Sequence, residues 1–121
     1  MKHLVSLLFA LAVSAMSPAA HAGGKFPTKP VRIIVPYSAG GPVDIITRGL
    51  SVRLSEEWKV SAVVDNKPGA NEIIGASEML RSPADGYTLL MATDSAFSQN
   101  QYLYEKLAYD PEAMVPITRH A

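Results

Sequence analysis

The chain has 121 residues, with 11 Lys and Arg against 11 Asp and Glu, and it contains no cysteine. A formal net charge of zero argues against nucleic acid as a partner, because nucleic acids are held by basic surfaces. The lack of cysteine excludes disulfides, thiolate metal sites and thiol nucleophiles.

The N-terminal segment is typical of a cleavable secretory signal. Lys2 and His3 precede the apolar run LVSLLFALAVSAM, and the small residues of Ala20-His21-Ala22 suit a cleavage site. About a dozen apolar residues are too few to span a bilayer, which takes roughly 20, although an uncleaved membrane anchor is the alternative. We expect cleavage after Ala22, leaving residues 23–121 as one small periplasmic domain with a formal charge of −1.

The run from Val31 to Val35 is β-branched and nearly free of polar residues, which predicts a strand covered on both faces, as in a parallel sheet. After a Gly-Gly turn, Pro42 suits the first turn of a helix that should reach about Trp58. Asp44 lies where a carboxylate stabilises the positive end of a helix. The expected apolar face of this helix consists of Val43, Ile46, Leu50, Leu54 and Trp58.

A second strand is predicted at Ser61 to Val64, followed by a Pro-Gly turn and a helix from Glu72 to Arg81 that Asn71 should cap. A third strand is predicted at Tyr87 to Ala92. The alternation of strands and helices indicates two right-handed crossovers and a parallel sheet. Beyond this sheet, we expect a short helix within residues 94–106 and the start of a strand at residues 117–121.

Three loops should meet at the carboxyl edge of this sheet, where open α/β sheets bind ligands. They comprise residues 36–41, 66–71 and 93–95. The first offers backbone N–H groups from Ser38 to Gly41, and the third offers the hydroxyls of Thr93 and Ser95. Together they predict a cradle for a small anion, most naturally a carboxylate. The alternative is that all three are ordinary turns whose glycines and prolines serve geometry only.

Several residues allow two interpretations. Asp44 either stabilises the helix end or accepts a bond from a ligand ammonium, and Asp94 either lies on a surface turn or binds a cation or an amine. A hydrolase that uses Ser38 or Ser95 as nucleophile lacks a nearby general base, since the histidines occupy positions 3, 21 and 120. Without a metal-ligand or nucleotide motif either, we expect no enzyme activity and no cofactor.

Four stretches carry a distinctive pattern: KFPTKPVRIIVPYSAGGPVDIITRGLSVRL, VVDNKPGANEIIGA, SPADGYTLLMAT and LYEKLAYDPEAMVPIT. In this order and spacing, across nearly all of Lys25 to Thr118, they resemble the N-terminal portion of the Bug/TctC family. Members of that family are periplasmic solute-binding receptors of tripartite tricarboxylate transporters.

The resemblance implies a type II periplasmic-binding-protein fold, in which two α/β lobes close around a small organic anion. The chain would be part of lobe 1, a parallel sheet core with flanking helices, and would lack the second lobe. Its implied partners are a small organic carboxylate solute and the membrane subunits of a tripartite tricarboxylate transporter. The alternatives are a nonfunctional truncated remnant and a receptor that signals to a sensor protein.

The resemblance also implies which residues contact the ligand. The loop after the first strand contacts a ligand carboxylate, partly through water, and the family's NRPGAGG turn falls on residues 66–72. The expected ligand-binding residues are Tyr37, Ser38, Ala39, Gly40, Gly41, Asp44, Asn66, Pro68, Gly69, Ala70, Thr93, Asp94 and Ser95.

The chain departs from the family pattern near this site. Asn71-Glu72 replaces the usual Gly-Gly, Lys67 stands where Arg is typical, and Val43 replaces a common hydroxyl residue. A carboxylate at Glu72 would repel an anionic ligand unless it points away or pairs with Lys67. An incomplete lobe would also expose sheet edges and apolar surface, from which we expect marginal stability or aggregation.

Overall fold

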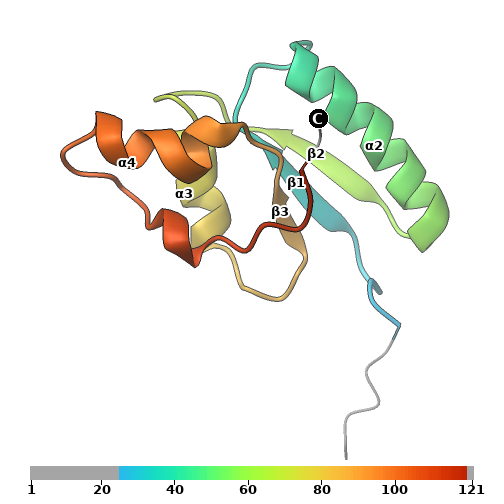
Figure 1. Ribbon diagram of the computed structural model, residues 1–121. Helices are drawn as coiled ribbons and strands as arrows, with labels where there is room; N and C mark the ends of the chain where they lie inside the picture. The colour runs from blue at the N-terminus through green and yellow to red at the C-terminus, as the bar shows by residue number, and fades with distance from the viewer. Residues whose placement is uncertain (1–24, 120–121) are drawn as a thin grey trace, which may run out of the picture.

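The computed structural model describes residues 25–119 and contains a three-stranded parallel sheet in the order β2-β1-β3. Figure 1 shows β1 between its two neighbours. The predicted α/β class, with a parallel sheet and flanking helices, is confirmed. The strands are β1 (Val31–Val35), β2 (Ala62–Asn66) and β3 (Thr88–Leu90).

Two helices flank the sheet, α2 (Pro42–Trp58) and α3 (Ile73–Arg81). Side chains alternate between the two faces of a strand. Asn66, in register with Val35, bonds to Asp44 of α2 at 2.9 Å, whereas Arg32, from the other set of side chains, bonds to Glu78 of α3 at 3.1 Å. The helices therefore cover opposite faces, and Figure 1 shows them on the two sides of the sheet.

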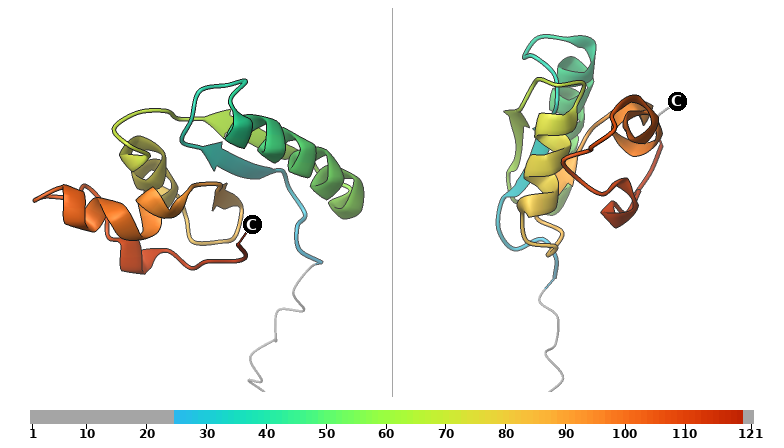
Figure 2. Two further views of the ribbon diagram at one scale, coloured as in Figure 1. Left: turned by 45° about the horizontal axis from the view of Figure 1, so that its top comes forward. Right: turned by 90° about the vertical axis from the view of Figure 1, so that its left-hand side faces the viewer.

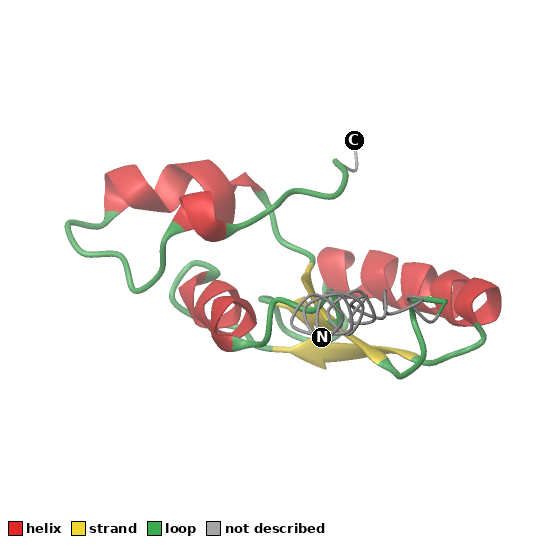
Figure 3. Cartoon of the chain, turned by 90° about the horizontal axis from the view of Figure 1, so that it is seen from below, coloured by secondary structure: helices red, strands yellow, loops and turns green. Residues whose placement is uncertain are grey.

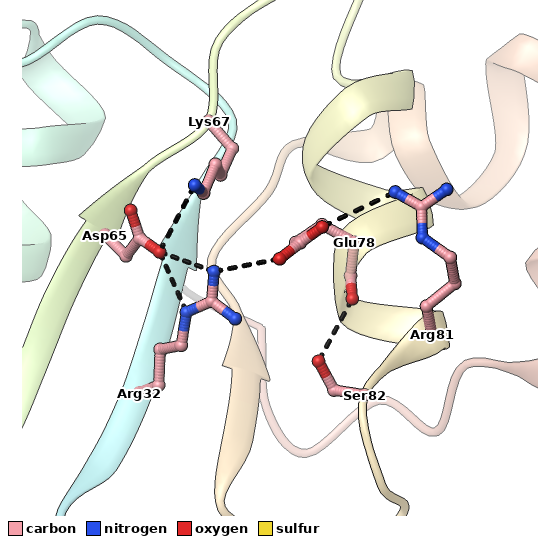
Figure 4. A network of polar contacts seen from close by, with 6 residues as sticks. All are labelled: Arg32, Asp65, Lys67, Glu78, Arg81 and Ser82. Atoms are coloured by element: carbon pink, nitrogen blue, oxygen red, sulfur yellow. Dashed lines mark hydrogen bonds and ion pairs between the residues drawn. The ribbon is translucent and has the colours of Figure 1, made fainter.

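An ion-pair network joins α3 to the middle of the sheet (Figure 4). The Arg32 guanidinium lies 2.5 Å from the Asp65 carboxylate on β2 and 3.1 Å from the Glu78 carboxylate. The hydrogen bond from Arg32 lowers the pKa of Glu78, with a further contribution from Arg81. Lys67 also lies 3.7 Å from Asp65. These contacts connect β1, β2 and α3 through their side chains.

The remaining segment packs mainly on α3 and also reaches Leu90 at the end of β3. It contains a π-helical turn η1 (Ser95–Gln99), the helix α4 (Asn100–Leu103) and a 3-10 turn η2 (Pro111–Ala113). Buried Ala96, Tyr109 and Met114 form a cluster with Ala76 of α3. Figure 2 shows this segment beside α3, and Figure 3 shows it clear of α2 and most of the sheet.

The central strand and one glycine define how closely the elements pack. Val31, Ile34 and Val35 of β1 are fully buried. At Gly75, in the first turn of α3, an added Cβ would lie 2.7 Å from Cβ of Pro36 and 3.2 Å from its Cα. Glycine therefore lets α3 begin directly against the end of β1.

The extent of α2 agrees with the prediction, but its predicted buried face is wrong. Ile46 and Leu50 are 48% and 40% exposed, whereas Asp44, Thr47 and Ser51 are buried. The Thr47 hydroxyl donates to the carbonyl of Val43 at 2.6 Å, and Ser51 donates to the carbonyl of Arg48 at 2.8 Å. Because these hydroxyls bond to the helix backbone, the small polar face can be buried without unpaired groups.

The other boundaries differ in detail. Glu72 precedes α3 instead of opening it, and β3 is shorter than predicted. Asn71 does not cap α3, because it exchanges hydrogen bonds with the fully buried Asn100 of α4: its Nδ2 donates to Oδ1 of Asn100 at 2.7 Å, and Nδ2 of Asn100 donates to its carbonyl at 2.8 Å. A strand is likewise absent from residues 117–119.

Two predicted features lie partly or wholly outside the described residues. These are the signal segment with its cleavage site, and the last two residues of the expected strand at 117–121. Within residues 25–119, none of the helices has the length and apolar character needed to cross a bilayer.

Paired substitutions test the assignment of core and surface. Ile34→Ala should lower the free energy of unfolding by about 2–5 kcal/mol, because a buried isoleucine leaves a cavity. Ile46→Ala makes the same chemical change on the exposed side of α2 and should alter stability by no more than about 0.5 kcal/mol. Urea denaturation followed by circular dichroism measures both. Equal losses would contradict the observed orientation of α2.

Candidate functional site

The loop after β1 forms a tight turn at the carboxyl edge of the sheet. The backbone N–H of Gly41 donates to the Ser38 carbonyl at 3.3 Å, and Gly40 has φ +84°. A positive φ at the third position, with this bond across the turn, is typical of a type II turn, in which glycine is favoured. The N–H of Gly40 donates to the Asp44 carboxylate at 2.8 Å.

These bonds narrow the predicted set of amide donors. The N–H groups of Gly40 and Gly41 are used within the corner, so they are not free to hold a ligand. Within the described part of the chain, the N–H groups of Ser38, Ala39 and Val43 donate no such bond. Val43 also lies in the first turn of α2, where the helix dipole favours an anion.

A pocket of about 420 Å³ lies at this corner. This volume falls in the range of small-molecule sites. Its lining includes four predicted site residues and two that the prediction omitted, Pro42 and Val43. The complete lining is Tyr37, Ser38, Gly41, Pro42, Val43 and Thr93.

Asp44 is held by a network that leaves it little capacity for a ligand. Its carboxylate accepts bonds from Arg48 at 2.8 Å, Gly40 at 2.8 Å and Asn66 at 2.9 Å, and Asn66 also donates to the Tyr37 carbonyl at 3.0 Å. The bond from Arg48, followed by those from Gly40 and Asn66, holds the pKa of Asp44 well below its usual range. The contacts favour a structural role for Asp44 at the helix end.

Glu72 connects all three loops, which sequence reasoning did not predict. Its carboxylate accepts hydrogen bonds from the hydroxyls of Tyr37 and Thr93, and from the Thr93 N–H at 3.0 Å. Burial, followed by the bond to Glu72, raises the pKa of Tyr37, which therefore remains a neutral donor at physiological pH. Glu72 is 2% exposed and points inward, away from Lys67, which pairs with Asp65.

The remaining predicted site residues lie around this centre. Pro68, Gly69 and Ala70 are exposed and do not line the pocket, while Asp94 is exposed and bonds to Gln99 at 2.5 Å. Ser95 is half-buried, with its N–H 3.5 Å from the Thr93 hydroxyl. The structure thus brings together the first loop, Asn66 and Thr93, and leaves the tip of the second loop outside.

One feature of the sequence could have indicated the unusual contacts of Glu72. Ala70, Asn71 and Glu72 have φ values of +46°, +49° and +72°, a left-handed conformation that glycine adopts most easily. For other residues it costs about 1–2 kcal/mol each, with Asn the most tolerant. The family's Gly-Gly at 71 and 72 indicated such a backbone, so a glutamate there implied compensating contacts.

A second pocket, of about 410 Å³, lies at the opposite end of α2. Phe26 and Trp58 belong to its lining, and their rings are 6.5 Å apart at the centroids. Because it lies near the amino ends of the strands, it is remote from the loops that bind ligands in open α/β sheets. The described residues also hold no group of three or more His, Asp or Glu side chains placed to bind a metal.

Comparison with known proteins identifies the family. A family model described as "Tripartite tricarboxylate transporter family receptor" matches residues 46–119. The chain belongs to this receptor family. Its members are periplasmic substrate-binding receptors rather than enzymes.

Two curated relatives of this TctC family chain come from Bordetella. A UPF0065 protein of Bordetella bronchiseptica is 37% identical over 107 residues, which cover 88% of this chain and 32% of the relative. Protein BugT of Bordetella pertussis is 39% identical over 71 residues, covering 59% of this chain and 22% of the relative. The chain thus spans about a third or less of these two curated relatives.

Solved structures of TctC and Bug proteins share the fold. R. palustris Rpa4515 with adipate is 38% identical with a TM-score of 0.68, covering 72% of this chain and 29% of that protein. The periplasmic binding protein BugD is 35% identical with a TM-score of 0.63, covering 71% and 28%. MatC from Rhodopseudomonas palustris with bound malate is 26% identical with a TM-score of 0.59, covering 72% and 30%.

Acid titration tests the Asp44 network. Because its folded pKa is lowered, ionised Asp44 stabilises the fold above the ordinary aspartate pKa of about 3.9, and this contribution disappears as the pH falls toward the folded pKa. Asp44→Asn should therefore destabilise the chain most at pH 7, with the difference shrinking below about pH 4. Urea midpoints at several pH values measure this.

Glu56→Gln is the control, since it removes an exposed carboxylate from the same helix. It should leave stability within about 0.5 kcal/mol at each pH. A destabilisation by Asp44→Asn that stays constant from pH 7 to pH 2 would show that the ionised carboxylate is not what matters.

Proposed function

We propose that this chain contributes the carboxylate-binding corner of a periplasmic receptor for a small organic anion. The observation that carries the proposal is the set of three unbonded amides, those of Ser38, Ala39 and Val43, at the positive end of α2 and beside the pocket. Backbone N–H groups at a helix N-terminus suit an anion without requiring a basic side chain.

The class of solute is supported by two family members. Rpa4515 was solved with adipate and MatC with malate, and both ligands are dicarboxylates. A dicarboxylate would place one carboxylate at the corner and extend the rest of its chain away from the first loop. We propose that the receptor delivers such an acid to the membrane subunits of a tripartite tricarboxylate transporter.

The pocket lining suits a ligand that has a carboxylate at one end and methylene groups next to it. Pro42 and Val43 provide apolar surface for the methylene groups of an organic acid, while Ser38 provides a hydroxyl and an N–H for its carboxylate. Residues 23–121 would then belong to the first lobe of the receptor, with residues 1–22 as its signal peptide. Ligand closure would need a second lobe opposite this edge, as the type II fold implies.

Nuclear magnetic resonance titration of the chain with adipate tests the proposed corner. The amide signals of Ser38, Ala39 and Val43 should shift in a saturable way. Shifts confined to residues around Trp58 would place the anion in the other pocket and contradict the proposal.

A single substitution can remove one of these donors. Ala39 occupies the second position of the type II turn, where proline is favoured. Ala39→Pro should keep the turn but weaken adipate binding at least about tenfold, because a hydrogen bond to a charged group contributes about 1.5–3 kcal/mol. Ala39→Ser keeps the N–H and should bind as the wild type does. Equal affinity of the proline variant would rule out the Ala39 amide as a donor.

The export step has its own test. On expression of residues 1–121 in a Gram-negative host, the periplasmic fraction should contain a chain that begins at Gly23. Mass spectrometry of the intact chain and of its N-terminal peptide measures this. A chain that retains Met1 and stays with the membrane would support the anchor interpretation instead.

A further inference from the structure

Three hydrogen-bond donors converge on the carboxylate of Glu72. The hydroxyls of Tyr37 and Thr93 donate to its Oε1, and the N–H of Thr93 donates to its Oε2 at 3.0 Å. The two hydroxyl oxygens lie 3.1 Å apart. Donors from two separate loops therefore surround a single carboxylate that comes from a third.

This arrangement has the composition of a carboxylate-binding site. It offers hydroxyl and backbone donors to both oxygens of the anion and lies in a water-poor place, since Glu72 is 2% exposed. Without the glutamate side chain, one hydroxyl could donate to the other, but the second hydroxyl hydrogen and the Thr93 N–H would have no acceptor here. Leaving these donors unpaired is costly, so an anion of the right size would be favoured there.

The backbone that delivers Glu72 supports the same interpretation. Glu72 has φ +72° and follows two more residues in the left-handed region, which side chains with a Cβ disfavour. Glycine would relieve this strain at position 72 but would supply no carboxylate. The three hydrogen bonds to the carboxylate offset this unfavourable backbone conformation. Glu72 can therefore keep it because its carboxylate occupies the site.

The cluster also borders the proposed ligand pocket. Tyr37 and Thr93 line that pocket and at the same time hold Glu72. A solute carboxylate that approached their hydroxyls would meet an acceptor already in place and a like charge. The donors that remain available to it at this corner include the amides of Ser38, Ala39 and Val43 and the Ser38 hydroxyl.

We propose that Tyr37 and Thr93 form a carboxylate-binding site that this chain fills with its own Glu72, which excludes a solute carboxylate from it. The inference rests on the proposed function for the identity of the excluded group. It makes Glu72 a specificity-determining residue, because it confines the acid group of the solute to the amides of Ser38, Ala39 and Val43.

Acetate rescue of Glu72→Gly tests the site. The substitution relieves the left-handed strain but removes the carboxylate, so the melting temperature of the variant should fall. Acetate should then bind the three donors and raise the melting temperature by at least about 4 °C, whereas chloride at equal ionic strength and the neutral isostere acetamide should not. The wild-type chain, in which Glu72 already occupies the three donors, measures the acetate effect at the first-loop amides alone, so acetate should raise its melting temperature by less than that of the variant.

A second variant ties the rescue to the named donors. Glu72→Gly combined with Thr93→Val should lose the response to acetate. If Glu72→Gly does not fold in chloride, refolding in acetate makes the same comparison: recovery in acetate alone supports the site, and failure in both salts overturns it. Equal stabilisation by acetate, chloride and acetamide would also overturn it.

The adipate titration of the wild-type chain separates this inference from the proposed function. Adipate should shift the amides of Ser38 and Ala39 but leave that of Glu72, which does not line the pocket, unchanged. A large shift at Glu72 would show displacement and overturn the exclusion. If adipate shifts no signal but acetate rescues Glu72→Gly, the proposed function fails and the filled site stands. If adipate shifts only the amides of the first loop and acetate does not rescue Glu72→Gly, the proposed function stands and the filled site fails.

Discussion

The arrangement of this site depends on one buried strand. β1 lies between two parallel neighbours and contributes the fully buried Val31, Ile34 and Val35. Because parallel strands end at the same edge, burying β1 in the middle of the sheet brings the following loops of all three strands together. The proposed ligand corner and the contacts of Glu72 both follow from that convergence.

Polar contacts then decide which groups at the edge remain available. Asp44 uses one glycine amide of the first loop, and the turn itself uses another. Glu72 uses the hydroxyls of Tyr37 and Thr93. What is left for a ligand is a short row of main-chain amides beside an apolar wall, which is a more restricted site than the three loops together suggest.

Much of the fold could be predicted from the sequence because its signals are local. The β-branched run at 31–35 and the proline at the start of α2 each act through backbone preferences within a few residues. The buried face of α2 could not be predicted in this way. Periodicity identified an apolar stripe through Ile46 and Leu50, but the buried stripe is polar. Asp44 of this stripe bonds to Asn66 of β2, and the hydroxyls of Thr47 and Ser51 are paired within the helix, which periodicity does not reveal.

The candidate site could likewise be predicted only in part from the sequence. The sequence pattern placed the first loop and Thr93 at one edge, since strand ends fix their positions. It did not predict the inward path of Glu72, which depends on a left-handed backbone and on donors from residues 35 positions earlier and 21 positions later. Long-range pairings of this kind leave no periodic trace in the chain.

The close contact between Gly75 and Pro36 limits how this region can change during evolution. Gly75 packs against Pro36 so closely that a methyl group would have to push the start of α3 outward. Glu72 lies three residues before that point, so such a displacement would withdraw its carboxylate from the neighbouring loops. We therefore expect selection to tolerate few replacements at position 75 for as long as position 72 carries an acid.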